Sequence, residues 1–406
     1  MPICRRVLQG LIGIVVMFTI LDLFELIVVS KHHKLSEIRP ALRQQKEAVV
    51  KVLRKENEQI KKGLSNFLHR RRGPPTLDPK EVEDTVNLIE YEDDPDVDFD
   101  KELVYEILEQ AGVKKRHMDL ETRRKLPTWT KVQQLYGKEP KIYGLERCEA
   151  FTSSIEPSVS FFGIAGMFNS GTNLLAELLI QNCQITKRMQ VYGQDQRGIR
   201  WQVPWGKHTP VKYRELHVTD TDREIPPENS FPMITIRDPY RWMLSMCKHT
   251  YGARWPHNKT TCPNIQDEDD YGPTPVFVKY AENRVRHNSL PEFWNDWYNE
   301  YFATDFPRVF VRFEDLLFYG KNVTQTLCKC GGGVPRRDHF VHVKSSAKLG
   351  TAAHGANKTG LLDALIQFGT DEGRLTGMTK RDLELSHKLL DPNLMKMFDY
   401  SYAMDF

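Results

Sequence analysis

The chain has 406 residues, with 57 Lys and Arg against 54 Asp and Glu, and 40% of its residues are hydrophobic. This balance excludes a mainly disordered chain, a collagen-like chain and a membrane protein with many spans. With a net charge of only +3, we expect no nucleic-acid partner.

An apolar segment at residues 7–29 follows two arginines near the start of the chain. At 1.5 Å per residue it forms about 34 Å of helix, enough to cross a hydrocarbon layer of roughly 30 Å. We predict a single-pass signal anchor that is not cleaved, with residues 1–6 in the cytosol and the remainder in a lumen. A cleaved signal peptide is the main alternative, because Val28 and Ser30 are small enough to precede a cut.

Residues 30–145 are predicted to form a stem and linker. Between residues 31 and 72, Lys and Arg outnumber Glu by thirteen to four, and apolar residues recur every three or four positions. That spacing indicates a basic helix, which either stays solvated or forms a homodimer by pairing weakly with a second copy. The acidic stretch at residues 91–100 is poor in apolar residues and is typical of a linker. We expect no packed core before about residue 145.

In residues 146–406, short apolar strands alternate with amphipathic helices. Strands are predicted at residues 161–165, 232–236 and 309–312, and helices at 174–180, 240–249 and 314–317. The alternation predicts a three-layer α/β/α fold, in which helices cover both faces of a central parallel sheet and ligands bind at the carboxyl ends of the strands. An aromatic run at residues 293–302 has helical spacing, which favours core packing over a groove for sugars.

Six cysteines and three glycosylation sequons lie after the apolar segment. The sequons begin at Asn258, Asn322 and Asn357, where a luminal chain could receive glycans. With Cys4 in the cytosol, the other six cysteines form an even set, for which disulfides or buried thiols are expected. Cys328 and Cys330 lack a second Cys or His pair at zinc-like spacing, so we predict no metal site there.

The stretch between the first predicted strand and its helix carries the clearest chemical signal. It reads Gly-Met-Phe-Asn-Ser-Gly-Thr-Asn at residues 166–173. A glycine-bounded turn there exposes backbone N–H groups at the positive end of the helix, which predicts a bound anion. ATP-type loops require Lys after the second glycine, and here Thr172 follows Gly171 directly, so a nucleoside triphosphate is disfavoured. A turn without a ligand would explain the glycines but not Ser170, Thr172 and Asn173 at the helix start.

A second element follows the strand at residues 232–236. Arg237 stands at the carboxyl end of that strand, and Ser245 lies eight residues further on, about two helical turns into the next element. Both side chains could converge on one phosphate. The alternative is that Arg237 pairs with Asp238 or another neighbouring acid.

Together these residues resemble the sulfotransferase family, which uses the donor 3′-phosphoadenylyl sulfate (PAPS). The resemblance covers about residues 158–320 and rests on Ser-Gly-Thr at residues 170–172, on Arg237 with Ser245, and on Arg-Phe-Glu-Asp-Leu at residues 312–316. It implies a P-loop-like fold in which residues 169–173 grip the 5′-phosphosulfate of the donor, while Arg237 and Ser245 bind its 3′-phosphate. The anchor, the stem and the sequons further resemble the type II membrane proteins of the Golgi in that family.

The chain departs from the family at one position. The family usually has Lys immediately before Ser-Gly-Thr, where its charge supports the leaving phosphate oxygen, and this chain has Asn169. Asn can donate a hydrogen bond but brings no charge. By motif, Lys207 is the candidate that would supply the missing cation. Without such a cation, the chain would be an inactive member of the family that binds a nucleotide or a glycan.

The segment Trp-Gly-Lys-His at residues 205–208 resembles the one that carries the family's catalytic base. We therefore predict that His208 removes the proton of the acceptor, since neutral imidazole is available near pH 7; a structural role for this histidine is the alternative. In-line transfer of a sulfuryl group requires no metal.

The resemblance and the luminal address together imply a Golgi sulfotransferase that acts on a hydroxyl or amine of a glycan. A tyrosine-directed or lipid-directed sulfotransferase is an alternative enzyme. The inactive nucleotide- or glycan-binding protein is the alternative from a different class.

Overall fold

The computed structural model describes residues 94–216, 225–258, 260–266, 272–343 and 360–403. The predicted signal anchor, the basic helix of the stem and the first residues of the acidic stretch lie outside the described residues. Within the described ranges, no helix is both long enough and apolar enough to span a membrane.

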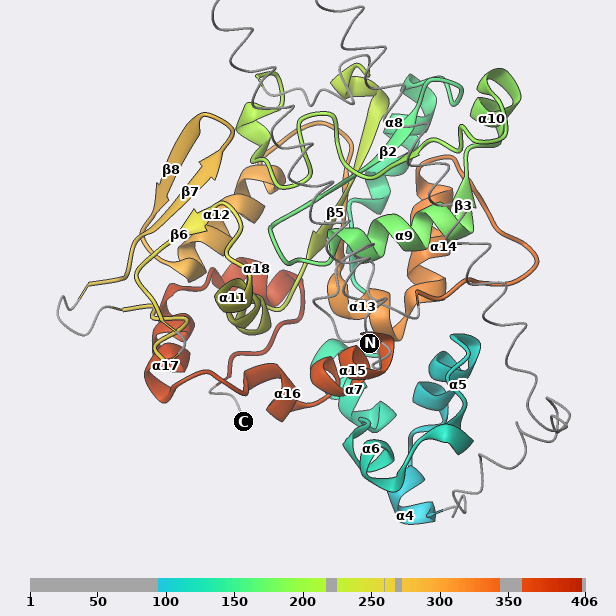
Figure 1. Ribbon diagram of the computed structural model, residues 1–406. Helices are drawn as coiled ribbons and strands as arrows, with labels where there is room; N and C mark the ends of the chain where they lie inside the picture. Colours follow the sequence, from blue (N-terminus) through green and yellow to red (C-terminus); the bar gives the residue numbers. More distant parts are fainter. Residues whose placement is uncertain (1–93, 217–224, 259, 267–271, 344–359, 404–406) are drawn as a thin grey trace, which may run out of the picture. The chain divides into compact units, whose positions relative to one another are not determined.

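A five-stranded sheet forms the centre of the described domain, with the strand order β1-β9-β5-β2-β4 (Figure 1). Four neighbouring strands run parallel: β2 (Phe161–Gly166), β4 (Ile199–Arg200), β5 (Ser230–Ile236) and β9 (Val309–Arg312). The edge strand β1 (Ile142–Tyr143) pairs antiparallel with β9. The prediction of a mixed α/β fold with a central parallel sheet is therefore confirmed for all strands but this edge.

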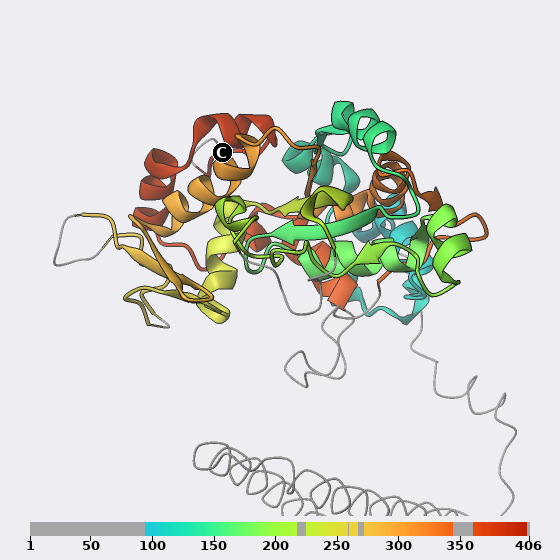
Figure 2. The same cartoon turned by 90° about the horizontal axis from the view of Figure 1, so that it is seen from above.

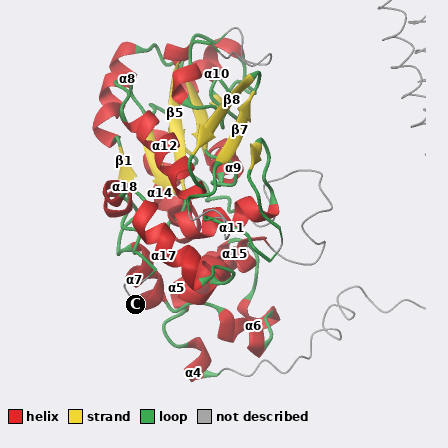
Figure 3. Ribbon diagram, turned by 90° about the vertical axis from the view of Figure 1, so that its left-hand side faces the viewer, coloured by secondary structure: helices red, strands yellow, loops and turns green. Residues whose placement is uncertain are grey.

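Alternate side chains of the central strands face two separate cores. Phe231 and Met233 of β5 pack with α9 (Thr172–Asn182) and α14 (Gly320–Cys330). Ile234 and Ile236 face the opposite core, with α11 (Pro239–Lys248) and α12 (Leu290–Phe302). Successive side chains of a strand point to opposite faces of the sheet, so a strand that is covered on both faces needs apolar residues on both. Helices accordingly flank the sheet in both of the other views (Figures 2 and 3).

The other elements complete the two helical layers and add two small sheets. The remaining helices are α4 (Pro95–Asp98), α5 (Glu102–Gln110), α6 (Leu120–Lys125), α7 (Trp129–Tyr136), α8 (Cys148–Ser154), α10 (Thr186–Tyr192), α13 (Phe313–Phe318), α15 (Gly360–Phe368), α16 (Asp371–Leu375), α17 (Lys380–Leu389) and α18 (Pro392–Met397). The small sheets are β3 (Cys183–Gln184) with β10 (Val334–Pro335), and β6 (Ala253–Arg254) with β7 (Val276–Tyr280) and β8 (Asn283–His287).

The expectation that no packed core precedes residue 145 is wrong. Val104 and Leu108 of α5 and Val132 of α7 are fully buried in the core that also holds α11 and α12. The hydroxyl of Tyr136 donates to the carbonyl of Phe368, 2.7 Å away and 232 residues later in the chain. These helices are amphipathic and bury one face against the domain, and they belong to the same compact unit as the central sheet.

Three disulfides join the six cysteines that follow the apolar segment, so the prediction of disulfides is confirmed. The pairs are Cys148–Cys330, Cys183–Cys328 and Cys247–Cys262. The two cysteines of α14 thus bind two different segments, which fixes that helix against α8 and β3. A disulfide that closes a long loop stabilises the fold mainly by restricting the unfolded chain.

Candidate functional site

The turn between β2 and α9 is shaped by two glycines. Gly171 has φ of 93°, in the left-handed region, and a Cβ atom there would overlap the ring of Phe313. A Cβ atom on Gly166 would overlap the hydroxyl of Thr235 in the neighbouring strand β5. Both positions therefore require a residue without a side chain.

The N-terminus of α9 is open toward the turn. The helix begins at Thr172, and no side chain caps its first N–H groups. The N–H of Leu174 donates to the carbonyl of Gly171 at 2.9 Å, while those of Thr172 and Asn173 precede the first helical hydrogen bond, and the helix dipole makes this end positive. Gly171 and Asn173 are partly exposed, so that an anion can approach the backbone here, as the sequence predicted.

Ser170 shapes the turn from inside. Its hydroxyl is fully buried, donates to the carbonyl of Met167 at 2.8 Å and lies 2.8 Å from the hydroxyl of Thr235. In this conformation the side chain of Ser170 thus holds the loop against β5 and does not face the solvent. Its contribution to anion binding comes through the position that it gives to the backbone.

Asn169 joins the turn to the far end of α11. Its backbone has φ of 59°, a conformation that asparagine tolerates better than most residues. Its Nδ2 atom donates to the carbonyls of His249 at 2.8 Å and Ser245 at 3.3 Å. The amide is therefore directed to the carboxyl end of α11, where all of its hydrogen bonds in the described structure are made.

Arg237 contacts the same loop from the end of β5. Its Nη1 donates to the carbonyl of Asn169 at 2.6 Å, and its guanidinium lies over the rings of Phe313 and Phe368. Among the described residues Arg237 forms no ion pair; the carboxylate of Asp238 instead accepts from Nε of Arg374 at 2.5 Å. Burial lowers the pKa of Arg237 to about 10, so the side chain keeps its charge at neutral pH.

Ser245 is half-buried, and its hydroxyl donates to the carbonyl of Arg241 within α11 at 3.0 Å. Its backbone carbonyl accepts from Asn169, and Asn169 in turn accepts from Arg237. Arg237 and Ser245 thus both contact Asn169 of the turn at residues 166–173, and their convergence on one phosphate stays a prediction.

Lys207 and His208 follow β4 and lie against the same turn. The N–H of Gly166 donates to the carbonyl of Lys207 at 2.8 Å. Nζ of Lys207 lies 2.7 Å from Oδ1 of Asn173, in the first turn of α9. The structure thus brings a lysine charge to the helix start from a different segment than the one that carries Asn169.

His208 contacts the end of β2 through one ring nitrogen. Nδ1 lies 2.7 Å from the carbonyl oxygen of Gly166. Because a carbonyl oxygen only accepts, Nδ1 must carry the proton, and the neutral ring then has its lone pair on Nε2. This tautomer gives Nε2 the form that a general base needs.

The aromatic residues of α12 hold the site from behind. Trp294 donates to the carbonyl of Arg237 at 3.1 Å, Trp297 to that of His208 at 3.2 Å, and Tyr298 to that of Thr235 at 2.9 Å. All three side chains are buried, which confirms core packing over a groove for sugars. The sequence analysis did not predict that these residues support the site, although the aromatic run at helical spacing could have indicated it.

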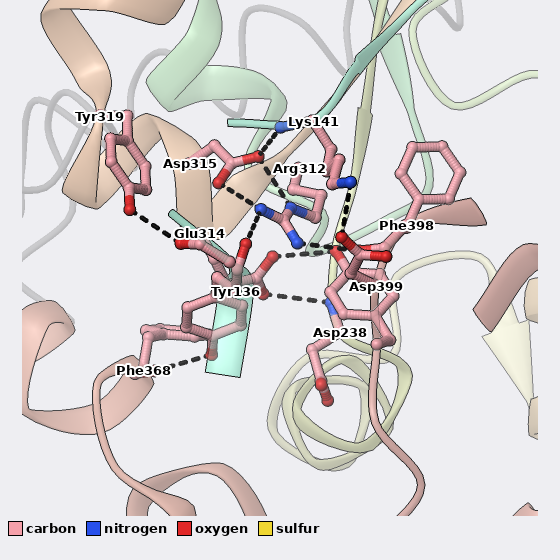
Figure 4. Close-up of polar contacts among 12 residues, drawn as sticks. Tyr136, Lys141, Asp238, Arg312, Glu314, Asp315, Tyr319, Phe368, Phe398 and Asp399 are labelled. Atoms are coloured by element: carbon pink, nitrogen blue, oxygen red, sulfur yellow. Dashed lines mark hydrogen bonds and ion pairs between the residues drawn. The ribbon is translucent and has the colours of Figure 1, made fainter. Parts of the chain in front are cut away.

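A buried polar network lies behind the end of β9 (Figure 4). Arg312 binds Asp315 through two hydrogen bonds of 2.7 Å. Glu314 accepts from the N–H of Asp238 at 3.1 Å and from the hydroxyl of Tyr400 at 2.9 Å. Burial, and then the nearby charge of Asp238, raise the pKa of Glu314 to about 7. The segment at residues 312–316 is thus part of the internal support of the site.

Sequence reasoning did not assign Tyr400 or Arg374 to this region, because both come from the C-terminal part of the chain. Within the described ranges, no group of three or more His, Cys, Asp or Glu side chains is placed to hold a metal ion.

The chain matches no protein-family model, no curated protein and no solved structure. The resemblance to the sulfotransferases therefore rests on the sequence motifs alone.

Proposed function

We propose that this chain is a sulfotransferase that moves a sulfuryl group from PAPS to a hydroxyl or amine of a glycan in the Golgi lumen. The observation that carries the proposal is the contact between two strand ends. Nη1 of Arg237 lies 2.6 Å from the carbonyl oxygen of Asn169. The side-chain Nδ2 of the same Asn169 lies 3.3 Å from the carbonyl oxygen of Ser245. One nucleotide with phosphates on its ribose 3′ and 5′ positions can bridge groups that lie this close.

In this proposal the two strand ends bind opposite ends of the donor. The uncapped N–H groups of α9 hold the 5′-phosphosulfate, with the charge of Lys207 beside them at Asn173. Arg237 and Ser245 hold the 3′-phosphate, since a guanidinium matches the oxygens of a phosphate. Lys207 then replaces the charge that Asn169 lacks.

The transfer itself needs a base on the acceptor side. Nε2 of His208 takes the proton of the acceptor hydroxyl while the acceptor oxygen forms a bond to sulfur. The bond between sulfur and the 5′-phosphate oxygen breaks in line, and its electron pair leaves with 3′-phosphoadenosine 5′-phosphate. Atoms and charge balance without a further reactant.

The compartment is part of the proposal. Residues 7–29 would serve as a type II signal anchor, with the described domain in the Golgi lumen. The three disulfides support this, because such bonds persist in oxidising compartments and are rare in the cytosol.

One observation favours an inactive nucleotide-binding protein as the second candidate. The side chain of Asn169 is bound to the carboxyl end of α11, so the position that usually supplies a lysine contributes nothing to the leaving group. Activity then depends on Lys207 alone.

Calorimetry of the full-length chain tests the proposal, with 3′-phosphoadenosine 5′-phosphate compared with ATP. We expect the former to bind at least tenfold more tightly, because Arg237 and Ser245 have no 3′-phosphate to bind in ATP. Binding of neither nucleotide would contradict the proposal. Tight binding without transfer of labelled sulfate to any glycan acceptor would favour the inactive protein.

A further inference from the structure

A cavity of about 1270 Å³ lies between α6, α11 and α16. Its walls include Arg124 and Lys125 of α6, Arg241 and Lys248 of α11, and Glu372 of α16. None of the nine candidate residues described above lines it. The cavity is therefore distinct from the candidate nucleotide site, although both use α11.

Arg241 is the unusual residue of this cavity. Its side chain is only 7% exposed, and its Nε atom is buried without a hydrogen-bond partner. Among the residues that the structure describes, nothing forms a hydrogen bond or an ion pair with its guanidinium. The carboxylate of Asp238, three residues earlier, accepts from the backbone N–H of Arg241 at 3.2 Å and from the side chain of Arg374.

A buried arginine whose guanidinium forms neither an ion pair nor a hydrogen bond with the described residues calls for an explanation. Burial lowers the pKa of Arg241, but a guanidinium does not lose its proton under physiological conditions. Removing such a charge from water is costly unless an opposite charge compensates it. Asp238 stabilises this charge in part, but its carboxylate is also bound to Arg374, so that an anion from outside the chain can supply the rest.

The surroundings of Arg241 are also positive. Lys248 lies seven residues along α11, on the same side of the helix, and Arg124 faces the cavity from α6; both are exposed. Of the two acids in the wall, Glu121 is bound to Lys125 at 2.5 Å, and Glu372 is exposed. His257 is stacked on Trp255 with its Nδ1 at 2.9 Å from the carbonyl of that residue.

We propose that this cavity binds an oxyanion, such as the sulfate, phosphate or carboxylate group of a ligand, through the guanidinium of Arg241. The planar fork of an arginine matches two oxygens of such a group. Lys248 and Arg124 add flanking charge at the mouth of the cavity. This inference does not depend on the proposed sulfotransferase activity, since no residue of that site takes part.

Binding of inorganic sulfate to the full-length chain tests the proposal. It is measured by calorimetry at constant ionic strength, with chloride as the replaced anion. We expect saturable binding that Arg241→Gln weakens at least tenfold and Lys248→Gln about threefold, because the first removes a direct contact and the second a screened charge. The matched control is Arg381→Gln, which removes an exposed arginine on α17 and leaves binding unchanged. Wild-type affinity in Arg241→Gln would overturn the proposal.

A second variant keeps the test decisive if Arg241→Gln fails to fold. Arg241→Lys retains the charge and loses the bidentate fork, so we expect affinity for sulfate to fall about fivefold, between the wild type and Arg241→Gln. If Arg241→Lys and Lys248→Gln both bind sulfate as the wild type does, Arg241 is not the contact and the inference is wrong.

The oxyanion could belong to the nucleotide or to an anionic acceptor, and competition distinguishes these sources. Sulfate binding that persists at saturating 3′-phosphoadenosine 5′-phosphate, together with tighter binding of a sulfated oligosaccharide than of its unsulfated form, assigns the cavity to an acceptor. Loss of sulfate binding when the nucleotide is added assigns the cavity to the donor. If the nucleotide does not bind at all, the proposed function fails and the sulfate measurement still decides this inference.

Discussion

Two neighbouring strand-to-helix turns at the same edge of the sheet have opposite local chemistry. The turn after β5 closes α11 with protein groups: the Asp238 carboxylate accepts from the N–H of Arg241, and Pro239 has no N–H to satisfy. The turn after β2 leaves α9 without any side-chain cap, because the residue before its first turn is Gly171. One helix end carries its own negative charge, whereas the other is left open to a negative charge from a ligand.

The difference shows that, of two helices that start at the same sheet edge, one can contribute to the stability of the fold while the other is available to bind a ligand. A capped and ion-paired helix start contributes to the free energy of unfolding, while an uncapped one gives up part of that contribution and can hold an anion. α11 still takes part in the candidate site, but through Arg237 before its start and Ser245 near its end. The N-terminus of α11, by contrast, is capped by the side chain of Asp238.

The largest effect is expected from removing the carboxylate that closes α11. Asp238→Ala deletes a helix cap and leaves the buried Arg374 without its counter-charge, and these losses together should lower the free energy of unfolding by about 4 kcal/mol. Urea denaturation measures the change. The matched control is Asp119→Ala, which removes an exposed cap from α6 and should cost about 1 kcal/mol. Equal losses in the two variants would show that the α11 cap is no different from an ordinary one.

At the open turn, the largest effect is expected on turnover. Lys207→Ala removes the only lysine charge that the structure places beside the start of α9, at Asn173. If that charge stabilises the leaving phosphate, sulfate transfer should fall by roughly 10²- to 10³-fold, with little change in stability. Lys212→Ala is a suitable control, because that residue lies on the same segment but pairs with Glu300. Near-normal transfer by Lys207→Ala would refute the hypothesis that Lys207 supplies the charge that Asn169 lacks.

The geometry of the open turn can be tested by two glycine variants. Gly171 and Gly193 both have positive φ, but a Cβ atom would overlap the Phe313 ring at Gly171 and meet nothing within 4 Å at Gly193. Gly193 has φ of 104° and ψ of 163°, a region that is essentially restricted to glycine, so Gly193→Ala should lower the free energy of unfolding by roughly 2 kcal/mol through backbone strain alone. Gly171→Ala adds overpacking and should cost about 3 kcal/mol. Similar midpoints of urea denaturation for the two variants would mean that the turn can relax around a side chain.

Much of the site's framework was predictable from local patterns. The three core strands are short apolar runs with helices after them, and chain order alone placed Arg237 and the turn at residues 166–173 at the same sheet edge. Parallel neighbours put their carboxyl ends together, which is why the contact between Arg237 and Asn169 could be anticipated. The even number of cysteines after the apolar segment allowed disulfides or buried thiols, and the structure shows that they form disulfides.

The parts that were not predictable depend on contacts between distant segments. Arg374 reaches Asp238 across 136 residues, and Tyr400 reaches Glu314 across 86. The apolar positions of α5 and α7 sit beside the acidic stretch at residues 91–100, whose composition suggested a linker and concealed a helical face that packs on the domain. The amide of Asn169 was expected to face the donor, but its bonds to the end of α11 arise only once both turns are folded.

The smallest effect concerns the pH dependence of the closed turn. Glu314 has an ordinary value of 4.5 and a folded pKa of about 7, raised by burial and by Asp238. Between these values the folded protein keeps a proton that the unfolded chain has released. The free energy of unfolding should therefore fall as pH rises from 4.5 to 7, by about 1.4 kcal/mol per unit where the difference is complete and by no more than roughly 3 kcal/mol in total.

Urea denaturation of the wild type and of Glu314→Gln across this range isolates the contribution, since the glutamine does not titrate. We expect the difference in the free energy of unfolding, wild type minus variant, to decrease up to about pH 7 and to level off above it. The exposed Glu282→Gln measures the effect of losing a glutamate elsewhere. A difference that stays constant from pH 4.5 upward would mean that Glu314 is ionised throughout. Asp238 and Glu314 would then both be charged at the start of α11, with Asp238 paired to Arg374 and the charge of Glu314 stabilised by Arg237.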